Sequence, residues 1–147
     1  MTIMAVDPVF IDTNVLVFAT IPASPLHQAA IAAVHRVAMS GAAAWISRQV
    51  LREYLVQLTR PGVLPPASAA IAVTQATALC ALYRVADETA MVSRELFTVL
   101  QSGLAAGKQV HDANIVATCR AYGIPRLLTH NAADFLRYAA LVRVETI

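Results

Sequence analysis

The sequence predicts a three-layer α/β/α sandwich around a parallel β-sheet. Short apolar segments of strand length alternate with longer segments of helical periodicity along the chain, and this alternation is typical of a parallel sheet with helices on both faces. With 147 residues and 58% hydrophobic residues, the chain can bury one substantial core. We find no repeat, linker or low-complexity tract, and we therefore expect a single domain over residues 1–147.

The first expected strand covers residues 8–11 (PVFI), because this apolar run has the length of a buried strand. Ser24 is expected to cap the next helix with Pro25 at its first position, and both residue types are favoured at these places. An apolar stripe at helical spacing follows, and Gly41 is expected to end the helix.

The next strand is predicted at residues 43–46 (AAWI), and Ser47 after it is expected to cap a helix that ends before Pro61. Another helix is predicted from Pro66 to about Leu82. This segment has no charged residue, but proline and polar residues interrupt it, so we interpret it as a buried helix rather than a membrane span.

The second half repeats the pattern of strands and helices. The expected elements are a strand at 83–87 (YRVAD), a helix at about 88–100, a glycine-containing loop to 108, a helix at about 112–122, a strand at 126–129 (RLLT), a short helix around 134 and a strand at 141–145 (LVRVE).

Charge and cysteine content limit the class of protein. The net charge is +2 and the pI is about 8.8, which suits a polyanionic partner without requiring one. Cys80 and Cys119 lie in apolar helical patterns without metal-binding spacing, so we expect two reduced, buried thiols in a cytosolic protein. The first basic residue is Arg36, which argues against a secretory signal peptide.

Polar residues follow several predicted strands directly. Ligands bind outside the carboxyl ends of strands in such sheets, and Asp12, Ser47 and the Thr129-His130-Asn131 run follow the strands at 8–11, 43–46 and 126–129. We therefore expect a site at this edge. Asp12 has an equally good alternative as the N-cap of a short helix that begins at Thr13.

Asp112 lies on the apolar stripe of its helix, in line with Ile115, Val116 and Cys119. Its carboxylate is either satisfied by the backbone amides and the dipole at the helix N-terminus, or it faces the core and needs a partner group there. Two carboxylates at one sheet edge are costly unless a cation neutralises them, and oxygen ligands suit Mg²⁺ or Mn²⁺.

Periodicity leaves three further residues undecided. Glu53 lies off the apolar stripe of its helix and by itself is interpreted as a solvated residue, whereas Asn131 is a candidate N-cap and Asp134 a candidate surface residue of the short helix. Phosphate-binding loops of the G-x-x-x-x-G-K-[ST] and G-x-G-x-x-G types are absent from the sequence. The acids do not match the patterns of haloacid-dehalogenase or receiver domains, and the histidines lack metal spacing.

The motifs FIDTNVL, REYL, VHDANIVAT and LLTHNAADFLRY resemble those of PIN-domain ribonucleases in order and position, from about Val9 to Val144. The greatest resemblance is to VapC toxins of toxin–antitoxin pairs. It implies an acidic site of Asp12, Glu53, Asp112 and a fourth position at Asn131, where the family often has Asp; Asp134 lies nearby.

This resemblance implies hydrolysis of RNA phosphodiester bonds with Mg²⁺ or Mn²⁺. Asp12 and Asp112 would be the metal ligands, Glu53 would complete the pocket directly or through water, and Thr13 and Thr129 would orient ligands or phosphate. It also implies a homodimer in the cytoplasm and a small VapB-like antitoxin partner. Two alternatives stay open: a catalytically degraded PIN fold that binds RNA or protein, and a PIN nuclease in another role such as RNA processing or DNA-end trimming.

Overall fold

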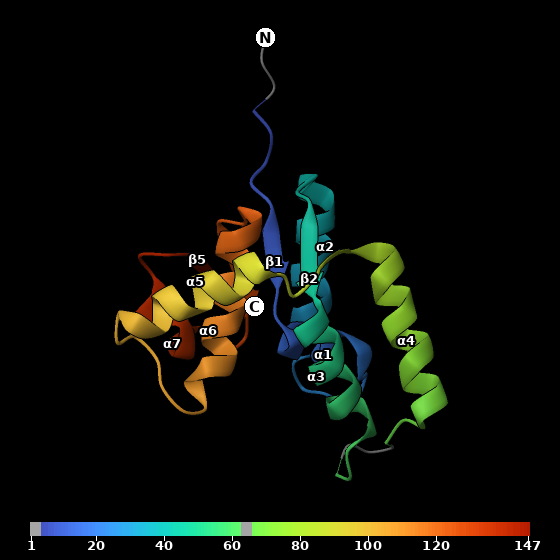
Figure 1. Cartoon of the computed structure of the whole chain (residues 1–147). Coiled ribbons are helices and arrows are strands. Elements are labelled where there is room, and N and C mark those ends of the chain that lie inside the picture. Colours follow the sequence, from blue (N-terminus) through green and yellow to red (C-terminus); the bar gives the residue numbers. More distant parts are fainter. Residues whose placement is uncertain (1–3, 63–65) are drawn as a thin grey trace.

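A parallel β-sheet with the strand order β3-β2-β1-β4-β5 organises the chain (Figure 1). The computed structural model describes residues 4–62 and 66–147. All neighbouring strands pair in parallel, with Phe10 opposite Trp45 on one side and Leu127 on the other. The strands are β1 Val9–Ile11, β2 Ala44–Ser47, β3 Arg84–Ala86, β4 Arg126–Thr129 and β5 Arg143–Thr146.

Helices cover both faces of this sheet. They are α1 Thr13–Thr20, α2 His27–Ser40, α3 Arg48–Thr59, α4 Ala69–Leu82, α5 Ala90–Gln101, α6 Gln109–Tyr122, α7 Ala132–Phe135 and the 3₁₀ turn η1 Leu136–Tyr138. Figure 1 shows α5 and α6 on one side of β1 and β2 and α4 on the other side. The predicted three-layer α/β/α sandwich around a parallel sheet is therefore confirmed.

The strand order reverses between β1 and β4. From β1 the chain proceeds outward to β2 and β3, then crosses back to β4 on the other side of β1. Such a reversal opens a crevice at the carboxyl ends of the two strands. All three residues of β1 are fully buried, as expected for a central parallel strand. Asp12 directly after β1 and Thr129 at the end of β4 thus lie where a site is expected.

Several element boundaries differ from the prediction. The α2 helix begins at His27, because the Ser24 hydroxyl accepts a hydrogen bond from the Leu26 backbone and forms a turn before the helix. The α4 helix begins at Ala69, where the Ser68 hydroxyl accepts from the Ile71 backbone.

Two element boundaries in the second half of the chain also differ from the prediction. The α6 helix begins at Gln109, three residues early, and the Gln109 side chain accepts a hydrogen bond from the Ala106 backbone before it. The strand β5 begins at Arg143, because the backbone groups of Leu141 and Val142 instead donate to the Tyr138 carbonyl.

The interpretation of α4 as a buried helix was wrong. Only Ala72, Ala76 and Leu79 are buried in it, whereas Ile71 is 56% exposed and Leu82 73% exposed. One narrow face packs, mainly on α3 and beside the edge strand β3, so the remaining apolar residues meet solvent. For the same reason Cys80 is exposed, contrary to prediction, while Cys119 is buried as predicted. No helix in the described part of the chain is long and apolar enough to cross a membrane.

Candidate active site

A cleft of about 520 Å³ opens at the carboxyl ends of β1 and β4. Acidic, polar and apolar side chains all line it. The lining residues are Asp12, Thr13, Asn14, Val17, Phe18, Ile21, Ser24, Arg52, Glu53, Val56, Gln57, Arg60, Asp112, Ile115 and Asn131. The four residues predicted to form the site, Asp12, Glu53, Asp112 and Asn131, therefore face one cleft.

Asp12 caps α1 and also lies in the cleft. Its Oδ1 accepts a hydrogen bond of 2.7 Å from the Thr13 backbone, and its Oδ2 accepts one of 2.7 Å from the Thr129 hydroxyl. The side chain is only 6% exposed. The pKa of Asp12 is raised to about 6, mainly by burial and also by the negative charges of Glu53 and Asp112, although the two hydrogen bonds oppose this rise.

Asn14 joins the two loops that flank the crevice. Its Nδ2 donates to Asp12 Oδ2 at 3.1 Å, and its Oδ1 accepts from the His130 backbone at 3.0 Å. The Thr129 hydroxyl in turn accepts from the Asn131 backbone at 3.0 Å. These contacts hold the loop after β4 against the start of α1, and they orient the Asp12 carboxylate.

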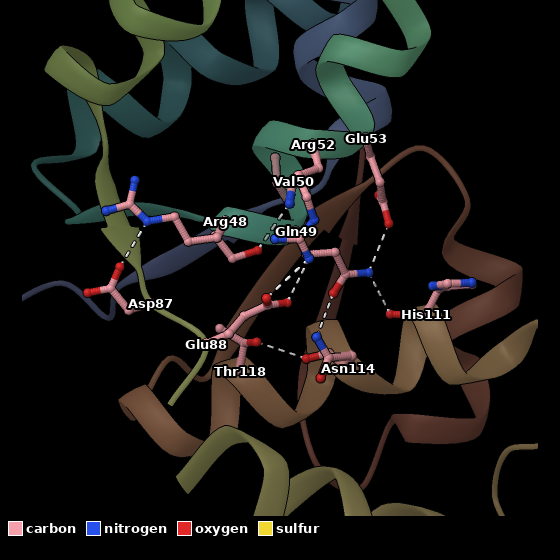
Figure 2. A network of polar contacts seen from close by, with 11 residues as sticks. Arg48, Gln49, Val50, Arg52, Glu53, Asp87, Glu88, His111, Asn114 and Thr118 are labelled. Atoms are coloured by element: carbon pink, nitrogen blue, oxygen red, sulfur yellow. Dashed lines mark hydrogen bonds and ion pairs between the residues drawn. The ribbon is translucent and has the colours of Figure 1, made fainter. Parts of the chain in front are cut away.

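Glu53 is half-buried, and both of its oxygens are held. Its Oε2 accepts a hydrogen bond of 2.9 Å from the Thr13 hydroxyl. Its Oε1 accepts one of 2.9 Å from Gln49 Nε2, which Figure 2 shows. The interpretation of Glu53 as a solvated residue was therefore wrong. The neighbouring arginines pair with other acids, Arg52 with Glu88 and Arg48 with Asp87.

Asp112 lies in the first turn of α6 and is half-buried. Burial raises the pKa of Asp112, and the charges of Asp134 and then Glu53 raise it further, whereas His111 and Arg137 oppose this rise. The charge of Asp134 raises the pKa of Asp112 more than the charge of Glu53 does. The carboxylate whose role was undecided thus acts electrostatically on the site from α7.

Asn131 lies exposed at the edge of the cleft. It occupies the N-cap position of α7, but its side chain makes no capping hydrogen bond there. Asn131 is thus the N-cap of α7 by position, as the alternative interpretation has it, but its side-chain amide does not cap the helix. Ser47 is the last residue of β2 rather than the residue after it, is 1% exposed and caps α3. It is not among the residues that line the cleft, so the expectation that it contributes to the site was wrong.

The donor set can hold one hydrated divalent cation. Asp12 and Asp112 offer carboxylate oxygens to one cleft, and burial, together with the charges of neighbouring acids, raises the pKa of both groups, so a bound cation would offset the cost of their ionised forms. Across residues 4–62 and 66–147, no group of three or more His, Cys, Asp or Glu side chains is arranged to hold one ion directly. Two carboxylates with waters in the other positions are a common Mg²⁺ environment.

Sequence reasoning missed three amides near the carboxylates: Asn14, Gln49 and Asn114. Asn14 stands two residues after Asp12, but its other partners, Thr129 and His130, lie 115 and 116 residues away. Gln49 is four residues before Glu53, and this spacing puts both on one helix face. That spacing was the one signal in the sequence that could have associated Gln49 with Glu53.

The chain is similar to known proteins in sequence and in fold. The sequence matches the model of the PIN domain family over residues 9–141. No curated protein sequence matches the chain.

Several solved structures share the fold. VapBC2 from Rickettsia felis, solved with promoter DNA, is 16% identical with a TM-score of 0.66 and covers 95% of this chain and 98% of its own. The sarcin-ricin loop cleaving toxin VapC20 from Mycobacterium tuberculosis is 23% identical with a TM-score of 0.60, over 81% of this chain and 86% of that chain. FitAcB from Neisseria gonorrhoeae is 15% identical with a TM-score of 0.69, over 92% and 95%.

Proposed function

The chain belongs to the PIN domain family, and on that premise we propose that it is a divalent-metal-dependent endoribonuclease, the toxin of a type II toxin–antitoxin pair. One observation carries the enzymatic part of the proposal. Asp12 is a buried carboxylate with its pKa raised to about 6, and Glu53 and Asp112 lie close enough to raise it. Buried acids with strongly perturbed pKa values in a cleft are typical of catalytic sites.

Asp12 and Asp112 are the proposed metal ligands. Thr129 and the Thr13 backbone fix the Asp12 carboxylate, and Glu53 adds negative charge to the same pocket, through water or directly. When bound, Mg²⁺ or Mn²⁺ would act as a Lewis acid, because it would neutralise charge on the phosphate oxygens and lower the pKa of a water. Hydrolysis then forms one bond from a water oxygen to phosphorus and breaks one ester P–O bond, and the leaving oxygen takes up a proton.

RNA is the proposed substrate. Arg52 and Arg60 line the cleft beside the acids, and arginine suits phosphate recognition. The fold is shared with a toxin that cleaves the sarcin-ricin loop. Asn131 at the fourth position removes one charge from the cleft, which is the observation in favour of a degraded site, while the Asp134 charge near Asp112 favours an active one.

The proposed antitoxin is a small VapB-like protein that covers the cleft. The apolar residues that line the cleft offer contacts for apolar side chains beside the acids; they are Val17, Phe18, Ile21, Val56 and Ile115. The fold is also shared with proteins solved as VapBC complexes. We place this toxin role in the cytoplasm.

A homodimer is also part of the proposal. The α4 helix exposes Ile71, Val73 and Leu82, and no charged residue lies between positions 66 and 83. Exposed apolar surface of this kind is typical of a protein interface. Analytical ultracentrifugation of the wild type and of an Ile71→Glu variant tests this part, with a dimeric wild type and a weakened dimer in the variant as the expected result. A monomeric wild type contradicts it.

The central experiment measures RNA cleavage by the purified protein with Mg²⁺, with Mn²⁺ and with excess EDTA. We expect cleavage only with the metals, and an Asp87→Asn variant serves as a matched surface control because Asp87 is exposed and pairs with Arg48. Full activity in EDTA contradicts the metal-dependent mechanism, and Mn²⁺ binding without any cleavage favours the degraded alternative.

Expression without a partner should slow growth, and coexpression with the product of an adjacent short gene should restore it. Normal growth with abundant folded protein argues against the toxin role. Inspection of the neighbouring reading frame for a short DNA-binding protein separates the toxin role from RNA processing or DNA-end trimming.

A further inference from the structure

Gln49 is a buried polar side chain at the start of α3, with 6% of its surface exposed. An amide removed from water costs free energy unless its donors and its acceptor find partners. The residues that line the cleft do not include Gln49, so the side chain lies behind the acids rather than among them. Its role must therefore be exerted through other groups.

Within residues 4–62 and 66–147, the hydrogen bonds of this amide all run to Glu53 or to the helix that carries Asp112. Nε2 donates to Glu53 Oε1 at 2.9 Å and to the His111 carbonyl at 3.0 Å, and Oε1 accepts from Asn114 Nδ2 at 2.8 Å (Figure 2). Glu53 belongs to α3, whereas His111 and Asn114 belong to the first two turns of α6. One side chain thus joins the helix that carries Glu53 to the helix that carries Asp112.

The orientation of the Gln49 amide is fixed by these partners. A carbonyl and a carboxylate oxygen both accept hydrogen bonds, so the Gln49 atom between them must be the NH₂ group. Its Oε1 then points to Asn114, whose NH₂ group must face it. Rotation of the amide by half a turn would place Oε1 against two acceptors.

Glu53 is consequently held from two sides. The Thr13 hydroxyl donates to Oε2 from α1, and Gln49 donates to Oε1. With each oxygen occupied once, the carboxylate plane cannot rotate freely, and each oxygen keeps a further lone pair for water or a cation.

We propose that Gln49 is a positioning residue that fixes Glu53 relative to the first turn of α6, so that the carboxylates of the cleft are arranged before a divalent cation binds. Asn114 completes this device because it sets the orientation of Gln49. The inference rests on the proposed metal-dependent function. Outer contacts that orient ligand groups commonly change metal affinity or activity by about 10- to 100-fold.

The experiment compares Gln49→Met, which keeps the side-chain volume but removes the amide, with Asn114→Ala and with the control Gln75→Met on the exposed face of α4. For each protein, Mn²⁺ binding is measured by electron paramagnetic resonance, unfolding by urea in EDTA, and RNA cleavage as a function of Mn²⁺ concentration. Mn²⁺ alone is the probe for binding.

We expect Gln49→Met to raise the Kd for Mn²⁺ about tenfold and to raise the Mn²⁺ concentration for half-maximal cleavage in parallel. Asn114→Ala should act in the same direction and more weakly. Because both residues act through one chain of contacts, the double variant should be no weaker in Mn²⁺ binding than Gln49→Met alone. The control should bind Mn²⁺ as the wild type does.

The inference is overturned if Gln49→Met binds Mn²⁺ with the wild-type Kd. It is also overturned if the weaker Mn²⁺ binding of this variant is fully explained by the fraction of its molecules that are unfolded. If Gln49→Met does not fold, the Mn²⁺ affinity of Asn114→Ala decides by the same criterion. A wild type that binds no Mn²⁺ overturns the proposed function together with this inference, whereas normal wild-type binding with unaffected variants overturns the inference alone.

Discussion

Replacing Asp12 with Asn should change the dependence of stability on pH in the metal-free protein. The folded pKa of Asp12 is raised from 3.8 to about 6, so the folded state binds this proton more tightly than the unfolded chain does. The ionised carboxylate therefore lowers stability as the pH rises through about 4 to 6. A rise of about 2 pKa units corresponds to about 3 kcal/mol, which is lost in full above about pH 7.

The substitution has an opposing cost. The Asn14 amide and the Thr129 hydroxyl both donate to Asp12 Oδ2, and an asparagine NH₂ group in that place cannot accept from either. Losing these contacts costs about 1–2 kcal/mol. The variant should therefore be less stable than the wild type near pH 4 and more stable, by about 1–2 kcal/mol, at pH 8.

Urea unfolding in EDTA at pH 4, 6 and 8 measures this change of sign, with Asp87→Asn as the control. Asp87 is 66% exposed, so its variant should differ little from the wild type at every pH. A stability difference between Asp12→Asn and the wild type that does not vary with pH would refute the reasoning. Mn²⁺ should then stabilise the wild type more than the variant, since binding favours the state that holds the cation.

Three further predictions concern single sites. Asp112→Asn should reduce cleavage by orders of magnitude while metal-free thermal stability holds or rises, because burial and neighbouring charge penalise its carboxylate; near-wild-type cleavage would contradict its role as a ligand. Thr129→Val removes a hydrogen bond that lowers the pKa of Asp12, so Mn²⁺ binding at pH 6 should weaken more than at pH 8; calorimetry at both values is the check. A thiol reagent should modify exposed Cys80 in the native protein and Cys119 only after unfolding, since burial raises the pKa of the Cys119 thiol; rapid modification of both would show that the core is open.

The sheet and two of the acids could be predicted because their signals are local. Asp12 interrupts an apolar run at a strand end, and Asp112 shares a stripe with buried neighbours such as Ile115. Each pattern covers fewer than ten residues, and the carboxyl-end rule for parallel sheets then brings the two together.

Glu53 could not be predicted from periodicity because its surroundings come from elsewhere in the chain. Thr13, which holds one of its oxygens, is 40 residues earlier, and the His111 carbonyl behind Gln49 is 62 residues beyond Gln49. A helical wheel shows only that Glu53 leaves the apolar stripe. It does not show whether another element covers that side.

The error in α4 has the opposite cause. Its composition is apolar all round, which normally indicates a helix buried on all sides. Burial, however, depends on the position of a helix in the fold, and α4 lies beside the edge strand β3, with α3 as its main neighbour. Composition alone therefore could not tell a buried helix from one with an open apolar surface.

The contact between Asp12 and Thr129 spans 117 positions of the chain, and β1 pairs with β4 across a similar separation. During translation, a ribosome must therefore synthesise almost the whole domain before Asp12 acquires its hydroxyl partner. Parallel pairing between such distant segments is also slow to form. The nascent polypeptide thus lacks a completed cleft until its last strands emerge from the exit tunnel, and this delay separates synthesis of the protein from the onset of any activity that the cleft supports.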